Sequence, residues 1–150
     1  MLLLLGGCSV SKTPDFIVCS KETGIAFIDE QQFALDIDFT KQSPVIKVNN
    51  SLNSFDTVYT FGEKGVEIKY DNISSLLSYS RIPDKNIALL TYRIVKALNS
   101  ENEAKWEKNG ELWYFSGKIN EATFKGICEE NGKITSFEIP EYKIYFKKSV

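Results

Sequence analysis

Alternation of apolar and polar residues with a period of two runs through most of this 150-residue chain. In its clearest stretch, residues 33–39, four apolar side chains would share one face of a strand, with Asp36 and Asp38 on the other. This period favours strands, and the apolar face of a sheet needs a second layer to cover it. The sequence therefore predicts a mainly antiparallel β fold.

Ten strands are expected, in two meanders. The first meander would contain residues 24–29, 33–39, 45–48, 55–61 and 66–70, and the second would contain 104–108, 111–119, 122–129, 133–139 and 142–147. Asn109-Gly110 and Asn131-Gly132 are typical of two-residue hairpin turns, which need positive φ values. The Ser-rich segment 71–81 is expected to be a loop or a helical turn that crosses an edge of the sheet.

One helix is predicted between the meanders, from Lys85 to Asn99. At 100° per residue, five side chains share one face of it: Ile87, Leu90, Thr91, Ile94 and Leu98. Leu89 falls on the opposite side, with the cationic residues. Several strands of the second meander are apolar on both faces, so a helix or a concave interior should cover the second face. The predicted fold is α+β, mainly β: a curved antiparallel sheet, or half-barrel, with one main helix on its concave face.

The N-terminal residues Leu2-Leu3-Leu4-Leu5-Gly6-Gly7-Cys8 resemble the lipobox of bacterial lipoproteins. We expect residues 1–7 to be a signal remnant, 8–15 a lipidated tether and 16–150 a single domain. Acylation of Cys8 would anchor the chain to the extracytoplasmic face of the bacterial cell membrane. The segment departs from a complete signal because it lacks a positively charged start and a longer apolar run, as a misplaced start codon would explain. The alternative is a short apolar strand or helix stub.

Composition excludes several kinds of function. The chain has no histidine, which is the commonest general base and metal ligand. Its net charge is −2, with acidic and basic residues interleaved, so nucleic-acid binding is not expected. No motif for a metal or a cofactor is present. Cys19 and Cys128 could form a disulfide outside the cytoplasm or remain two buried thiols, and the spacing leaves both open.

Asp36 and Asp38 would lie about 6.6 Å apart on one face of a strand. Paired carboxylates ~6.5–9.5 Å apart act in inverting glycoside hydrolases, but there they flank the bond from opposite sides. Side chains that project in parallel from one strand cannot do so. We therefore expect a solvated face, and no enzymatic activity.

The order of elements from Phe33 to Phe146 resembles the lipoprotein-carrier superfamily. The resemblance is carried by the C-terminal meander: Phe115-Ser116-Gly117, Phe124-Lys125-Gly126, Gly132-Lys133-Ile134, Phe137-Glu138-Ile139-Pro140 and Ile144-Tyr145-Phe146. The superfamily includes outer-membrane lipoprotein carriers, mycobacterial lipid-binding lipoproteins and a spore-germination lipoprotein of anaerobic Firmicutes. It implies a concave sheet that binds acyl chains or partner proteins without catalysis, and it assigns no residue here.

Two functions are expected from these observations. The first is a lipid-anchored extracytoplasmic protein that binds a lipid or another hydrophobic ligand without catalysis. Its pocket would be lined by Trp113, Phe115, Phe124, Ile127, Ile87, Leu90 and Ile94. The alternative is a protein-interaction module of the cell envelope or spore, with the concavity filled and with the sheet edges or an aromatic face used for docking. A contiguous exposed patch that includes Trp106 or Trp113 would favour it.

Overall fold

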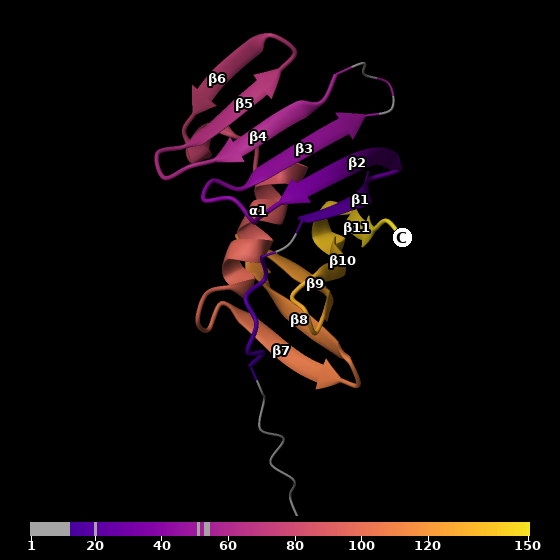
Figure 1. Ribbon diagram of the computed structural model, residues 1–150. Coiled ribbons are helices and arrows are strands. Elements are labelled where there is room, and N and C mark those ends of the chain that lie inside the picture. Colours follow the sequence, from indigo (N-terminus) through magenta and orange to yellow (C-terminus); the bar gives the residue numbers. More distant parts are fainter. Residues whose placement is uncertain (1–12, 20, 51, 53–54) are drawn as a thin grey trace, which may run out of the picture.

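The computed structural model describes residues 13–19, 21–50, 52 and 55–150. Within them it contains eleven strands and one α-helix (Figure 1). The first six strands are β1 (Lys21–Ile28), β2 (Gln31–Asp38), β3 (Val45–Asn50), β4 (Thr57–Phe61), β5 (Val66–Tyr70) and β6 (Ile73–Leu77). Helix α1 (Ile87–Leu98) follows, and then β7 (Ala104–Asn109), β8 (Leu112–Ile119), β9 (Ala122–Glu129), β10 (Ile134–Ile139) and β11 (Ile144–Lys148). Two 3₁₀ turns, η1 (Tyr79–Arg81) and η2 (Pro140–Tyr142), complete the elements.

All eleven strands form one antiparallel sheet in the order β6-β5-β4-β3-β2-β1-β11-β10-β9-β8-β7. The pairing of β1 with β11 joins the two meanders, so the first and last strands lie side by side at the centre. Strands β6 and β7 occupy the two ends of this order, and the sheet is open. The predicted mainly-β antiparallel sheet with one helix is confirmed, while its half-barrel curvature stays a prediction.

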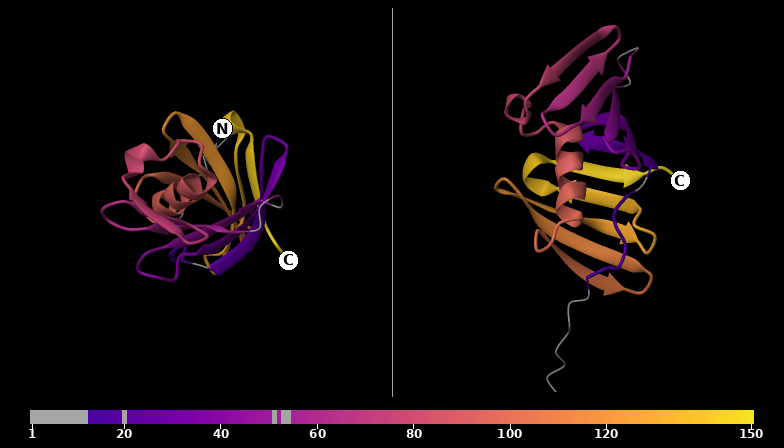
Figure 2. Two further views of the ribbon diagram at one scale, coloured as in Figure 1. Left: turned by 90° about the horizontal axis from the view of Figure 1, so that it is seen from above. Right: turned by 60° about the vertical axis from the view of Figure 1, so that its left-hand side comes forward.

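Helix α1 lies on one face of the sheet, with its axis running across the strands (Figure 2). It begins after Asn86, whose side chain accepts a hydrogen bond from the backbone N–H of Leu89 at 3.0 Å. Nine of its twelve residues are buried, Leu89 among them. The expectation that Leu89 faces solvent was therefore wrong. The helix contacts both β3 and β8, far apart in the strand order, so its buried surface is wider than one stripe.

The side chains that face the helix form the core. Phe61 of β4 stacks on Tyr92 of α1, with ring centroids 4.3 Å apart. In the second meander, Phe124 of β9 and Phe146 of β11 are both completely buried. Burial of such rings is the main favourable term in the folding of a sheet onto a helix.

Strand β6 was not predicted. It follows β5 through a two-residue turn at Asp71 and Asn72, because Tyr70 pairs with Ile73. Asp71 has a φ of 53°, which supplies the positive value that a tight hairpin turn needs. The first meander therefore has six strands, and segment 71–81 is a strand followed by a 3₁₀ turn rather than a loop.

Both Asn-Gly hairpins exist, but neither turn lies where the dipeptide predicted it. Asn109 is still paired in β7, with Leu112, so the turn residues are Gly110 and Glu111, and Gly110 has a φ of 63°. The N–H of Glu129 donates to Lys133 O at 2.9 Å, which leaves a three-residue loop that ends at Gly132. Glycine supplies the positive φ in both cases, and asparagine does not.

Residues 13–19 pass beside β7 and the C-terminal end of α1. The ring of Phe16 packs edge-on against Trp106 at 5.8 Å and against Trp113 at 6.0 Å. The side-chain amide of Asn99, just after the helix, accepts a hydrogen bond from Val18 N–H and donates one to Val18 O, each at 2.8 Å. This segment covers both tryptophans, and the predicted exposed aromatic patch around them is absent: each is at most 9% exposed.

Candidate functional site

Six of the seven side chains expected to line a pocket are buried. Trp113, Phe115, Phe124, Ile87, Leu90 and Ile94 are all 7% exposed or less. The aromatic ones pack against one another, with the rings of Phe115 and Phe124 6.2 Å apart. Over β8 and β9, therefore, the helix and these rings fill the space between the two layers.

Ile127 is on the other face of the sheet. Strand β9 alternates, so Phe124 and Cys128 point toward the helix, whereas Ile127 points away from it and is partly exposed. Ile127 lines a broad, open depression of about 1720 Å³ on the solvent-facing surface of β7–β10. An ion pair crosses that surface, from Lys125 to Glu138 at 2.9 Å. Ile127 was expected to line the same pocket as the aromatic residues, and this expectation was wrong. Ile127 is three positions from Phe124, and residues an odd number of positions apart on a strand face opposite sides of the sheet.

A smaller hollow lies on the face that carries the helix, at the N-terminal end of α1. It has a volume of about 270 Å³. Nine residues line it: Ile28, Phe33, Val48, Asn50, Thr57, Tyr59, Lys85, Asn86 and Ile87. They come from the first four strands and the start of the helix. In this half of the sheet the inward-facing residues include the small side chains of Val48 and Thr57, whereas β8 and β9 carry large aromatic rings. The smaller side chains leave the hollow between the sheet and the start of the helix.

Polar groups line this hollow on both sides: Asn50, Thr57 and Tyr59 come from the sheet, and Lys85 and Asn86 come from the start of the helix. Asn86 caps the helix with its side-chain oxygen, and its Nδ2 donates to the hydroxyl of Tyr59 at 3.2 Å. Lys85 is exposed at the rim, where its Nζ lies 5.3 Å from the centre of the Tyr142 ring. Ile28, Phe33, Val48 and Ile87 supply an apolar lining. The arrangement is suited to a molecule with an apolar body and a polar end.

Of the residues around this hollow, only Ile87 was named from the sequence. The period of two does place Phe33, Val48 and Tyr59 on inward-facing positions, so this signal was present. What brings them together is strand register: β2 pairs Phe33 with Asn50, and β3 pairs Val48 with Thr57. Register and the position of the helix start are tertiary features that the sequence pattern does not specify.

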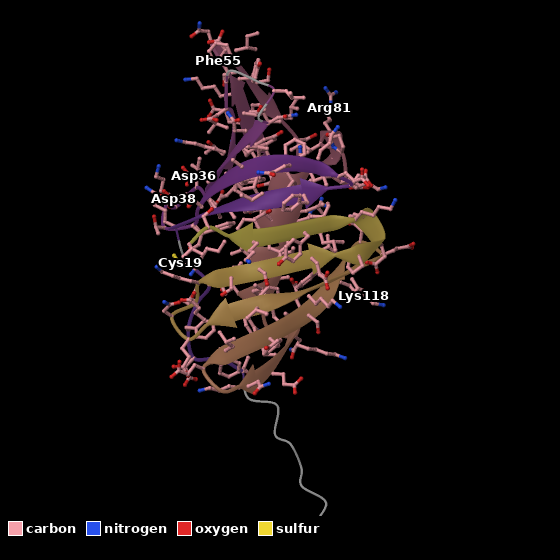
Figure 3. All side chains as sticks on the ribbon, turned by 90° about the vertical axis from the view of Figure 1, so that its right-hand side faces the viewer. Cys19, Asp36, Asp38, Phe55, Arg81 and Lys118 are labelled. Carbon is pink, nitrogen blue, oxygen red and sulfur yellow. The ribbon has the colours of Figure 1, made fainter. Side chains whose placement is uncertain are left out.

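Asp36 and Asp38 lie at the end of β2, near Cys19 (Figure 3). One oxygen of Asp38 accepts hydrogen bonds from the Thr40 hydroxyl at 2.6 Å and from the Thr40 N–H at 3.0 Å. These bonds hold the pKa of Asp38 below its usual value, with a smaller contribution from Lys41. Asp38 thus stabilises the turn after β2. A general acid needs the opposite shift, and the geometry gives no support to a catalytic pair.

Cys19 and Cys128 are free thiols in the structure, as in the second of the two alternatives. Cys128 is completely buried, and burial raises the pKa of its thiol to about 12. Cys19, by contrast, is exposed, with its Sγ 3.1 Å from Phe39 O. The alternative of two buried thiols is therefore wrong in one respect, because the thiol of Cys19 is exposed.

We expect a thiol-specific disulfide reagent at pH 8 to label one cysteine of the folded full chain carrying Cys8→Ser. Cys19 is accessible, whereas Cys128 is both buried and protonated at that pH. Absorbance of the released chromophore should give one equivalent, rising to two in denaturant. Cys19→Ser should abolish the fast equivalent, and Cys128→Ser should preserve it. A disulfide would give no equivalents in either state, which would contradict the structure.

Cys8, the predicted lipidation site, lies outside the described residues. In the described part of the chain, no helix has both the length and the apolar character needed to cross a membrane. Nor do the described residues include a cluster of three or more acidic or cysteine side chains that could hold a metal ion. The search for similar proteins found no family model, curated protein or solved structure that matches this chain, so the resemblance to lipoprotein carriers stays a prediction.

Proposed function

We propose that this chain is a non-enzymatic binding protein that holds a hydrophobic ligand in the hollow at the start of α1. The observation that carries the proposal is the open hollow of about 270 Å³ between the start of the helix and strands β1–β4, whose lining is about half apolar. Pockets for drug-sized ligands usually measure about 300–1,000 Å³, so this space suits a single short hydrocarbon chain. Burial of that chain would stabilise the complex by about 25 cal/mol per Å² of apolar surface.

The second part of the proposal is a lipid anchor at Cys8 on the extracytoplasmic face of the membrane. The lipobox resemblance of residues 2–8 supports it. The described chain begins at Thr13, five positions after Cys8, and an extended chain spans at most about 3.6 Å per residue. An anchored domain would therefore begin within about 18 Å of the acylated cysteine. Because residues 13–19 run beside β7, that end of the sheet would be nearest the membrane (Figure 1).

Native mass spectrometry of the full chain carrying Cys8→Ser, purified without added lipid, tests ligand binding. We expect a reproducible extra mass that organic extraction removes. Thr57→Trp should eliminate it, because Thr57 lines the hollow and an indole would fill the space. Thr60→Trp is the matched control, since Thr60 is on the same strand with its side chain on the opposite face. A bare polypeptide mass for the parent chain, in both purified and lipid-supplemented samples, would overturn the proposal.

One observation favours the alternative of a protein-interaction module. The β5–β6 hairpin carries exposed apolar side chains at the end of the sheet, with Ile73 70% and Leu76 68% exposed. Strand β6 has a free edge and no charged residue, whereas the opposite edge strand, β7, carries three lysine or glutamate side chains in its middle. Charges on edge strands oppose unwanted pairing, so β6 lacks that protection. Absence of a co-purified ligand would make this the leading function.

A further inference from the structure

We infer that the ligand of this hollow carries an anionic headgroup, which the ammonium group of Lys85 recognises. The inference rests on the proposed function and adds the chemical class of the ligand: a short, single-chain amphiphile with a carboxylate or phosphate end. Lys85 is the one charged residue among the described residues that line the space. The residues that line the space therefore include no acidic side chain that would repel a negatively charged headgroup.

The charge of Lys85 is available to a ligand. No ion pair among the described residues includes it. The preceding residue, Asp84, is exposed to solvent and lies 3.8 Å from Arg93, with which it forms an ion pair, and it does not line the hollow. The ring of Tyr142 lies 5.3 Å from Lys85 Nζ and restrains the ammonium at the rim without neutralising it.

The position of Lys85 also matches the shape of the hollow. Lys85 and Asn86 precede the first turn of α1, whereas the apolar lining comes from β1–β3 and Ile87. A hydrocarbon chain lying against Phe33 and Val48 would thus place its head at the start of the helix. The positive end of the helix dipole favours the same sign of ligand charge there.

The test compares octanoate with octan-1-ol, which share a hydrocarbon chain and differ in charge, by isothermal titration of the full chain carrying Cys8→Ser. We expect octanoate to bind more tightly. Lys85→Gln should weaken octanoate binding about fivefold, the effect of losing one exposed charge pair, and leave octanol binding unchanged. Added salt should weaken only octanoate. Lys64→Gln is the control, because Lys64 follows the opposite end of β4 from Thr57 and does not line the hollow.

The outcomes separate the two proposals. Equal binding of octanol and octanoate, with no effect of Lys85→Gln, would overturn the headgroup inference and leave the hydrophobic-ligand proposal in place. Binding of neither probe to the parent or to Lys64→Gln would reject both. To distinguish carboxylate from phosphate, octyl phosphate is titrated in a third arm: the anion that binds the parent chain more tightly identifies the preferred headgroup, and both should lose affinity with Lys85→Gln.

Discussion

Replacement of Phe124 by alanine should destabilise the fold by about 4 kcal/mol, the usual cost of removing a large aromatic side chain from a packed core. Phe124 is completely buried in β9. Its ring lies directly over Gly117, the residue opposite it on β8, and 6.2 Å from the ring of Phe115. Neighbours fixed in a sheet cannot collapse into the space it leaves, so both the burial energy and the packing are lost. Urea unfolding followed by tryptophan fluorescence measures the change.

Phe27→Ala is the matched control for this substitution. Phe27 is 40% exposed on β1, where it faces solvent opposite Tyr145 of β11. Its loss should cost no more than about 1 kcal/mol, as for a cross-strand surface pair. Equal losses of stability for the two variants would show that the core is not centred on β8 and β9 as described. The slope of the unfolding free energy against urea concentration should be the same for the parent, Phe124→Ala and Phe27→Ala if the substitutions change only stability.

The strand content could be predicted because the apolar alternation is regular. In β2 the side chains of Leu35 and Ile37 face the core and those of Gln32 and Ala34 are exposed, as a period of two requires. In β6 the signal fails, since Ser74, Ser75 and Leu76 are all exposed at the edge of the sheet and no buried face marks the strand. The remaining indication in the sequence was the pair Asp71-Asn72, since both residue types tolerate the positive φ that Asp71 adopts in the turn.

The candidate site could be predicted only in its chemical character. An excess of apolar residues indicated a hydrophobic interior, and the helix does lie on the face where these residues gather. The sequence did not indicate which half of the sheet the helix would fill. Residue volume decides it: Trp113, Phe115 and Phe124 take up the space over β8 and β9, whereas Val48 and Thr57 leave a hollow over β3 and β4.

The glycines of the second meander allow this close filling. Phe115 is paired with Gly126, and Phe124 with Gly117, so each ring lies over a residue without a side chain on the neighbouring strand. This arrangement covers the glycine backbone with an aromatic ring from the neighbouring strand. The helix can then approach β8 closely, and its other end remains over the smaller residues of β3.

Gly126→Ala should therefore destabilise the fold by about 3 kcal/mol, the upper part of the range for overpacking a core. An added Cβ would overlap the backbone oxygen of Ser136 on β10 as well as the ring of Phe115. A ring can rotate away, but the backbone of a paired strand cannot move without breaking its hydrogen bonds. Adding Phe115→Leu should thus recover only part of the loss, and urea unfolding of the single and double variants measures the coupling between the two residues.

Gly62→Ala provides the comparison, because the nearest atom to an added Cβ at Gly62 is Gly65 O at 3.5 Å, an ordinary contact. Its stability should stay within about 0.5 kcal/mol of the parent. If Gly126→Ala is equally neutral, β9 and β10 are not packed as closely as described. Loss of co-purified ligand from Gly126→Ala at a temperature where it is fully folded would have another meaning. It would connect the filled half of the sheet to the hollow, either through α1 or through the paired central strands β1 and β11.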